Sequence, residues 1–125
     1  MNYLIYSSIL GILHILIAAS TSTLQRGLKW NLSARDDSAA PLSGVGARLD
    51  RASKNFFETF PIFVAAILAV IVQNRTSPQV ELGAQLYFFA RLVYLPLYAF
   101  GIPMVRSLAW FVSLVGIGFL LCAAL

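Results

Sequence analysis

Four polar residues in one short stretch of the chain, Arg51, Lys54, Asn55 and Glu58, are of the types that bind charged ligands. Arg51, Asn55 and Glu58 are spaced at i, i+4 and i+7, so on a helix they share one face. The stretch leads directly into an apolar run at residues 62–72. Polar groups at such a place are costly unless they bind a ligand or one another. The stretch is therefore either a brace within a helix bundle or part of a binding site.

Two further groups of polar residues lie in later apolar runs. Arg91, Tyr94 and Tyr98 are spaced at i, i+3 and i+7, which places them on one face of a helix. Arg106 and Ser107 open the last apolar run of the chain. Arginines can hold carboxylates through paired hydrogen bonds, and tyrosines can donate further hydrogen bonds to an anion. The residue types thus suit an anion site.

Pairing within the chain would satisfy only part of this charge. An ion pair between Glu58 and Arg91 on neighbouring helices would lower the desolvation cost of both side chains. It would leave Arg51, Lys54 and Arg106 in surplus. These cations would then either extend to anionic lipid headgroups or line an anion site.

The elements that position these residues are predicted from the apolar runs. The chain has 125 residues, of which 59% are hydrophobic and only 11% charged, whereas a soluble domain is usually about one quarter charged. The apolar runs are long enough to span a bilayer, roughly 20 residues each. The sequence predicts an all-α, integral-membrane four-helix bundle in a single domain. Its helices are expected at residues 2–25, 51–74, 79–100 and 104–125.

The distribution of basic residues predicts the orientation in the membrane. The first connection and the third one carry most of the cations, namely Arg26, Lys29, Arg35, Arg48, Arg51, Lys54 and Arg106. The second connection carries only Arg75. Because cationic connections stay in the cytoplasm, both termini of this multi-pass protein are expected on the non-cytoplasmic side. The cations form no patch with interleaved aromatic residues, so no nucleic-acid partner is expected.

Two isolated residues have simple interpretations. His14 lies near the middle of the first apolar run, where an ionisable residue is a functional candidate by default. No potential ligands stand at metal-binding spacing from it, so a neutral histidine bonded to a neighbouring helix is the favoured interpretation. The single cysteine, Cys122, is interpreted as a small apolar residue.

The order of the polar residues resembles a known family. The pattern Arg51-Ala-x-x-Asn55-x-x-Glu58-x-x-Pro61-x-Phe63 resembles the signature of the MAPEG family, the membrane-associated proteins in eicosanoid and glutathione metabolism. So do Ala90-Arg91-x-x-Tyr94-x-x-x-Tyr98 and Gly101-x-Pro103-x-x-Arg106-Ser107 with Trp110. The resemblance covers nearly the whole chain. It is strongest to short bacterial members, which implies a bacterial inner membrane.

This resemblance implies a homotrimer that binds glutathione between its subunits. The positions that match glutathione-binding positions of the family are Arg51, Lys54, Asn55, Glu58, Arg91, Tyr94, Tyr98, Arg106, Ser107, Trp110 and Arg26. A guanidinium near the sulfur, here Arg106, would lower the pKa of the thiol and stabilise the thiolate, and Ser107 would donate a hydrogen bond to it. Tyr94 stands where prostaglandin E synthase has a histidine, so that enzyme's particular chemistry does not carry over.

The sequence is compatible with three functions. The first is a glutathione-dependent transferase or peroxidase whose lipophilic electrophile arrives from the lipid, between the first and fourth helices of adjacent subunits. The second is a non-catalytic, lipid-binding membrane scaffold of the same family. The third is a small membrane protein whose polar cluster is structural or passes a solute.

Overall fold

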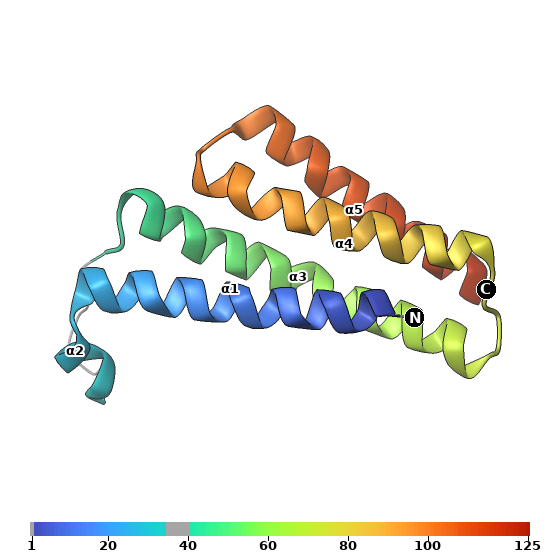
Figure 1. Ribbon diagram of the computed structural model, residues 1–125, viewed down its shortest axis with the longest axis horizontal. Coiled ribbons are helices and arrows are strands. Elements are labelled where there is room, and N and C mark those ends of the chain that lie inside the picture. The colour runs from blue at the N-terminus through green and yellow to red at the C-terminus, as the bar shows by residue number, and fades with distance from the viewer. Residues whose placement is uncertain (1, 35–40) are drawn as a thin grey trace.

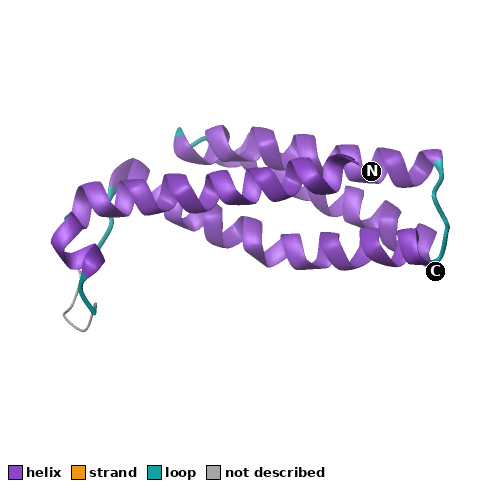
Figure 2. Ribbon diagram, turned by 60° about the horizontal axis from the view of Figure 1, so that its bottom comes forward, coloured by secondary structure: helices purple, strands orange, loops and turns teal. Residues whose placement is uncertain are grey.

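The computed structural model describes residues 2–34 and 41–125, and in these parts the chain is helical (Figure 1). No strand is present among the described residues (Figure 2). Part of the predicted first loop, with Arg35, Asp36 and Asp37, lies outside them. The helices are α1 (Asn2–Arg26), the short α2 (Leu28–Leu32), α3 (Gly44–Val72), α4 (Pro78–Ala99) and α5 (Pro103–Ala124).

The start of α3 differs most from the sequence-based expectation. The helix begins at Gly44 rather than at residue 51, so Arg51 lies two turns inside it. Gly46 is buried in the first turn of this helix, and a Cβ atom there would collide with the side chain of Gln25. The glycine therefore serves close packing of α3 against the end of α1. Gln25 also exchanges two hydrogen bonds of 2.9 Å with the backbone of Ser43, directly before α3.

Local signals explain the starts of the last two long helices. The hydroxyl oxygen of Ser77 accepts a hydrogen bond from the backbone nitrogen of Val80, which caps α4. Pro78 and Pro103 occupy the first turns of α4 and α5. Proline is tolerated there because the backbone nitrogens of a first turn have no acceptor within the helix. Gly101, with a φ of 71°, makes the tight turn between these two helices.

The long helices run antiparallel to their neighbours in sequence (Figure 1). Both termini lie at one end of the bundle, and the α1–α3 connection and the α4–α5 turn lie at the other. The most extensive contact joins α4 to α5, where Gly83 and Gly116 let the two backbones approach closely. The core between α3, α4 and α5 includes Phe63 stacked on Tyr87, with ring centroids 4.0 Å apart.

Length and composition make three of the helices suitable for crossing a membrane, namely α1, α3 and α5. Large apolar side chains such as Ile12, Leu16 and Phe111 are exposed on their outer faces, as lipid contact requires. The expectation of four spans is met by this criterion for three helices only. The remaining long helix, α4, contains Glu81 and Arg91, which lower its apolar character.

Candidate functional site

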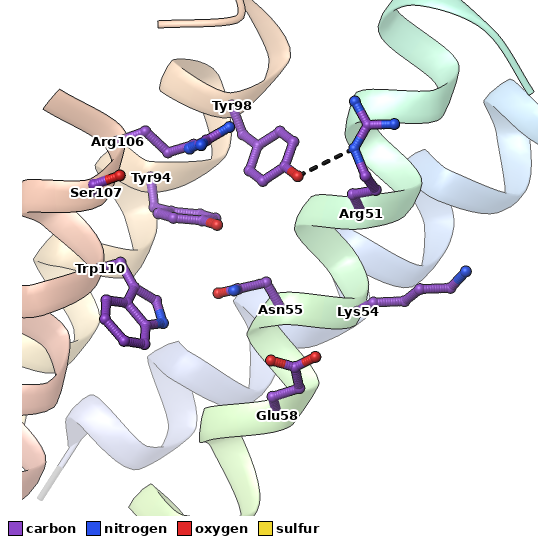
Figure 3. A pocket seen from close by; sticks show the side chains of 9 residues that line it. All are labelled: Arg51, Lys54, Asn55, Glu58, Tyr94, Tyr98, Arg106, Ser107 and Trp110. Atoms are coloured by element: carbon purple, nitrogen blue, oxygen red, sulfur yellow. Dashed lines mark hydrogen bonds between the residues drawn. The ribbon is translucent and has the colours of Figure 1, made fainter. Parts of the chain in front are cut away.

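A cavity of about 420 Å³ lies between α3 on one side and α4 and α5 on the other (Figure 3). Its lining residues all belong to the predicted set: Arg51, Lys54, Asn55, Glu58, Tyr94, Tyr98, Arg106, Ser107 and Trp110. Packing thus brings side chains of α3 together with side chains of the consecutive helices α4 and α5. Arg26 and Arg91 are the predicted residues that do not line this cavity.

Tyr98 connects the two arginines of the cavity. The Arg51 Nε donates a hydrogen bond of 3.2 Å to the Tyr98 hydroxyl, the contact drawn as a dashed line in Figure 3. The guanidinium carbon of Arg106 lies 4.6 Å from the centroid of the Tyr98 ring, and that of Arg51 lies 5.8 Å from it. Such cation–π contacts favour a fixed position for each guanidinium. One tyrosine on α4 therefore orients a cation from α3 and a cation from α5.

Arg91 lies behind the cavity wall rather than in the cavity. Its side chain is fully buried, and its Nη1 donates a hydrogen bond of 2.9 Å to the Asn55 Oδ1. Its guanidinium carbon lies 4.2 Å from the Tyr94 ring centroid. The predicted ion pair between Arg91 and Glu58 is wrong, because within residues 2–34 and 41–125 these side chains do not come within ion-pair distance. The amide of Asn55 takes the place that was expected for the carboxylate.

Glu58 lies one helical turn beyond Asn55 and is exposed at the cavity. In the described part of the chain it has no cation within ion-pair distance. Lys54 pairs instead with Asp50, at 3.0 Å, and its side chain is 73% exposed. In Figure 3 it extends away from the two tyrosines, so it belongs to the rim of the cavity. Asp50 had not been predicted, although its i, i+4 spacing from Lys54 was a signal for the pair.

Residues of α5 form the opposite wall. The Ser107 hydroxyl donates a hydrogen bond of 3.1 Å to the Pro103 carbonyl oxygen one turn earlier, so it must rotate before it can donate to a ligand. Trp110 presents its indole ring to the cavity from the next turn (Figure 3). Arg26 lies elsewhere, at the end of α1, with its guanidinium carbon 5.1 Å from the Trp30 ring centroid.

His14 is buried between α1 and α3 and stacks on Phe56, with ring centroids 4.7 Å apart. Neither ring nitrogen has a hydrogen-bond partner among the described residues. The predicted bond from this histidine to a neighbouring helix is therefore wrong. Phe56 also lies 5.5 Å from the Arg91 guanidinium carbon. The sequence did not predict this position of Phe56 between His14 and Arg91, because a phenylalanine in an apolar helix has no distinguishing pattern.

The arrangement of charge limits what the cavity can bind. Arg51 and Arg106 supply two guanidinium groups, and Glu58 supplies one carboxylate that no cation of the described residues pairs with, all beside apolar helices. Electrostatic attraction is stronger in such surroundings than in water. The cavity therefore suits a molecule with anionic groups and a separate cationic group. The described residues contain no group of three or more histidine, cysteine or acidic side chains that could hold a metal ion.

The model of the MAPEG family matches residues 3–125, which is essentially the whole chain. No curated protein matches the chain.

Proposed function

Because the chain belongs to the MAPEG family, we propose that it is a membrane-bound, glutathione-dependent transferase or peroxidase that acts on lipophilic electrophiles. The observation that carries this proposal is the cavity that gathers Arg51, Arg106 and Glu58 among apolar helices. Family membership and the three apolar helices make the chain a membrane protein. What we infer beyond this is the ligand, the reaction and the assembly.

Glutathione suits the cavity in size and charge. A volume of about 420 Å³ falls in the range of small-molecule sites, roughly 300–1,000 Å³. Glutathione carries two carboxylates and one ammonium group. Arg51 can hold a carboxylate through paired hydrogen bonds. Glu58, which pairs with no cation in the described part of the chain, can hold the ammonium group. Tyr98 keeps Arg51 in place before the ligand arrives, so less side-chain entropy is lost on binding.

The reaction requires the thiolate of glutathione, because the neutral thiol is a poor nucleophile. We assign Arg106 to stabilise this thiolate, since its guanidinium lies at the cavity against the Tyr98 ring. Ser107 would supply a hydrogen bond to the same sulfur after its hydroxyl turns away from the Pro103 carbonyl. The thiolate would then attack an apolar electrophile that enters from the lipid between α1 and α5 of adjacent copies.

We further propose that the protein is a homotrimer with four spans, α1, α3, α4 and α5, in a bacterial inner membrane with both termini on the non-cytoplasmic side. Arg51 and Glu58 are exposed on a helix that is otherwise apolar enough to span the bilayer. Exposed charges on a membrane-spanning helix are costly unless a ligand or another protein surface covers them. A neighbouring copy of the chain would provide this cover. In such an assembly, Arg26 of one copy would reach the cavity of the next.

The test compares two arginine-to-alanine variants of the purified protein in detergent. Arg106→Ala removes the proposed thiolate stabiliser, whereas Arg75→Ala removes a cation that bonds the Ala124 carbonyl, at the opposite end of the bundle. Conjugation of glutathione to 1-chloro-2,4-dinitrobenzene should fall at least about 100-fold for Arg106→Ala, as for loss of one preorganised charge-stabilising group. It should change less than about twofold for Arg75→Ala. Equal activity of the two variants would refute the role of Arg106.

Ligand binding distinguishes the enzyme from the lipid-binding scaffold. Glutathione should raise the thermal unfolding midpoint of the unaltered protein, because a ligand that binds only the folded state stabilises it. A shift with a fatty acid but none with glutathione would favour the scaffold.

A further inference from the structure

Arg91 is a buried cation that has no carboxylate partner among residues 2–34 and 41–125. Its side chain is fully buried, its Nε and Nη2 have no hydrogen-bond partner, and the described parts of the chain hold no acidic group within ion-pair distance of it. Burial of an unpaired charge is costly, which makes an ionisable residue inside an apolar helix a candidate for a functional role. Within the described ranges its side chain makes one hydrogen bond, from Nη1 to the Asn55 Oδ1, and this bond directs attention to Asn55.

The chemistry of the guanidinium group determines the orientation of Asn55. A guanidinium carries only donors and no acceptor. The atom of Asn55 that faces Arg91 must therefore be the carbonyl oxygen, because the amide nitrogen would bring two donors together. The two ends of a planar amide point apart, so the Asn55 nitrogen is directed away from Arg91. Since Asn55 lines the cavity, this nitrogen is presented to the ligand as a donor.

Arg91 itself is held in one position. Its guanidinium carbon lies 4.2 Å from the ring centroid of Tyr94 and 5.5 Å from that of Phe56. Tyr94 is 3% exposed and lines the cavity, so it separates Arg91 from the ligand. The two rings keep the guanidinium in place. The Asn55 amide therefore cannot turn over without breaking its hydrogen bond to Arg91.

We infer that Arg91 is a positioning residue, which locks the Asn55 amide with its nitrogen toward the cavity and so makes this wall select a ligand carboxylate. This role rests on the proposed function, since it takes glutathione as the ligand. An unlocked asparagine could turn its oxygen to the ligand and accept a neutral group equally well. With Arg91 behind it, Asn55 can only donate, and a carboxylate is the partner that gains most from a donor.

The first test needs no ligand. Asn55→Asp puts a carboxylate against the unpaired guanidinium, so it should keep or raise the thermal unfolding midpoint of the detergent-solubilised protein. In an Arg91→Met background the same change leaves a carboxylate without a cation, and the midpoint should fall. Arg91→Met should itself fold, because a side chain of similar length replaces a costly charge. If Asn55→Asp lowers the midpoint equally in both backgrounds, Asn55 does not face Arg91 and the inference is overturned.

The second test compares the binding of glutathione with that of glutathione diethyl ester, whose carboxyl groups are neutral. The unaltered protein should prefer the free acid at least tenfold. Asn55→Asp and Arg91→Met should each reduce this preference at least threefold through weaker binding of the acid, while Arg51 preserves the rest of it. Their affinity for the ester should stay within threefold. Arg91→Lys, which keeps a donor and a charge, should restore part of the preference.

A purely structural role of Arg91 would lower the affinity for acid and ester alike, and that result would overturn the inference. Failure of the unaltered protein to bind glutathione at all would instead refute the proposed function. The unfolding measurements would still decide the orientation of Asn55 in that case, so the two failures are distinguishable.

Discussion

The crossing of α4 and α5 provides the sharpest test of the fold, through the substitution Gly116→Ala. A Cβ atom at Gly116 would lie 2.6 Å from the carbonyl oxygen of Gly83 and 2.8 Å from the backbone nitrogen of Tyr87. Ordinary contact begins at 3.4 Å, so the closer approach is about 0.8 Å too short. Both neighbouring atoms belong to the backbone, so no side-chain rotation can relieve the collision. The two helices would have to move apart.

The expected magnitude follows from two opposing terms. Overpacking of a core costs about 1–3 kcal/mol, and the rigid backbone places this case near the upper end. Replacement of glycine by alanine inside a helix offsets about 1 kcal/mol of that cost. We expect Gly116→Ala to lower the free energy of unfolding by about 2 kcal/mol.

Gly118→Ala is the matched control on the same helix. A Cβ atom there meets nothing within 4 Å, so this variant should be unchanged or more stable by up to about 1 kcal/mol. Both variants would be unfolded by sodium dodecyl sulfate in mixed micelles, with circular dichroism as the readout. If the two variants have the same stability within error, the close approach of α4 and α5 does not exist in solution.

Two further substitutions test the surroundings of the cavity. Tyr98→Phe removes the hydroxyl that accepts a hydrogen bond from Arg51 but keeps the ring against Arg106. Glutathione affinity, measured by calorimetry, should therefore fall roughly tenfold, while turnover at saturating glutathione stays within about twofold. A selective loss of turnover would contradict this division of roles. His14→Phe replaces a buried ring whose nitrogens have no hydrogen-bond partner in the described part of the chain, so the thermal unfolding midpoint should rise because no polar group is left desolvated. A lower midpoint for that variant would show that the histidine is bonded in solution.

Much of the candidate site was predictable because its residues repeat on helical faces. Arg51, Asn55 and Glu58 share one face of α3 through their spacing alone, and the structure places all three at the cavity. The spacing of Arg91, Tyr94 and Tyr98 suggested one common role, yet Tyr94 and Tyr98 line the cavity and Arg91 lies behind it. A helical face is broad, and only the packing of α3 against α4 decides which edge of it is covered.

Pairing of charges was harder to predict than their location. Glu58 and Arg91 are charges of opposite sign in neighbouring apolar helices and so were the expected partners, but Arg91 bonds Asn55 instead. Asn55 and Glu58 lie one helical turn apart on α3. Which of them meets Arg91 depends on how far α3 is shifted along its axis relative to α4. The start of α3 was missed for a similar reason, since Gly46 serves packing against Gln25 and makes no turn.

The sequence by itself determined the class of this protein. Apolar runs of bilayer length, few charges, and polar residues at helical spacing are properties of the chain that need no knowledge of packing. Only the tertiary structure decided how these polar residues are used. It gathered two arginines around Tyr98, left Glu58 without a protein cation among the described residues, and buried Arg91 behind Asn55. The physical reason is that hydrogen bonds and charge interactions act over a few ångströms, a distance at which the rotation and height of each packed helix determine which groups meet.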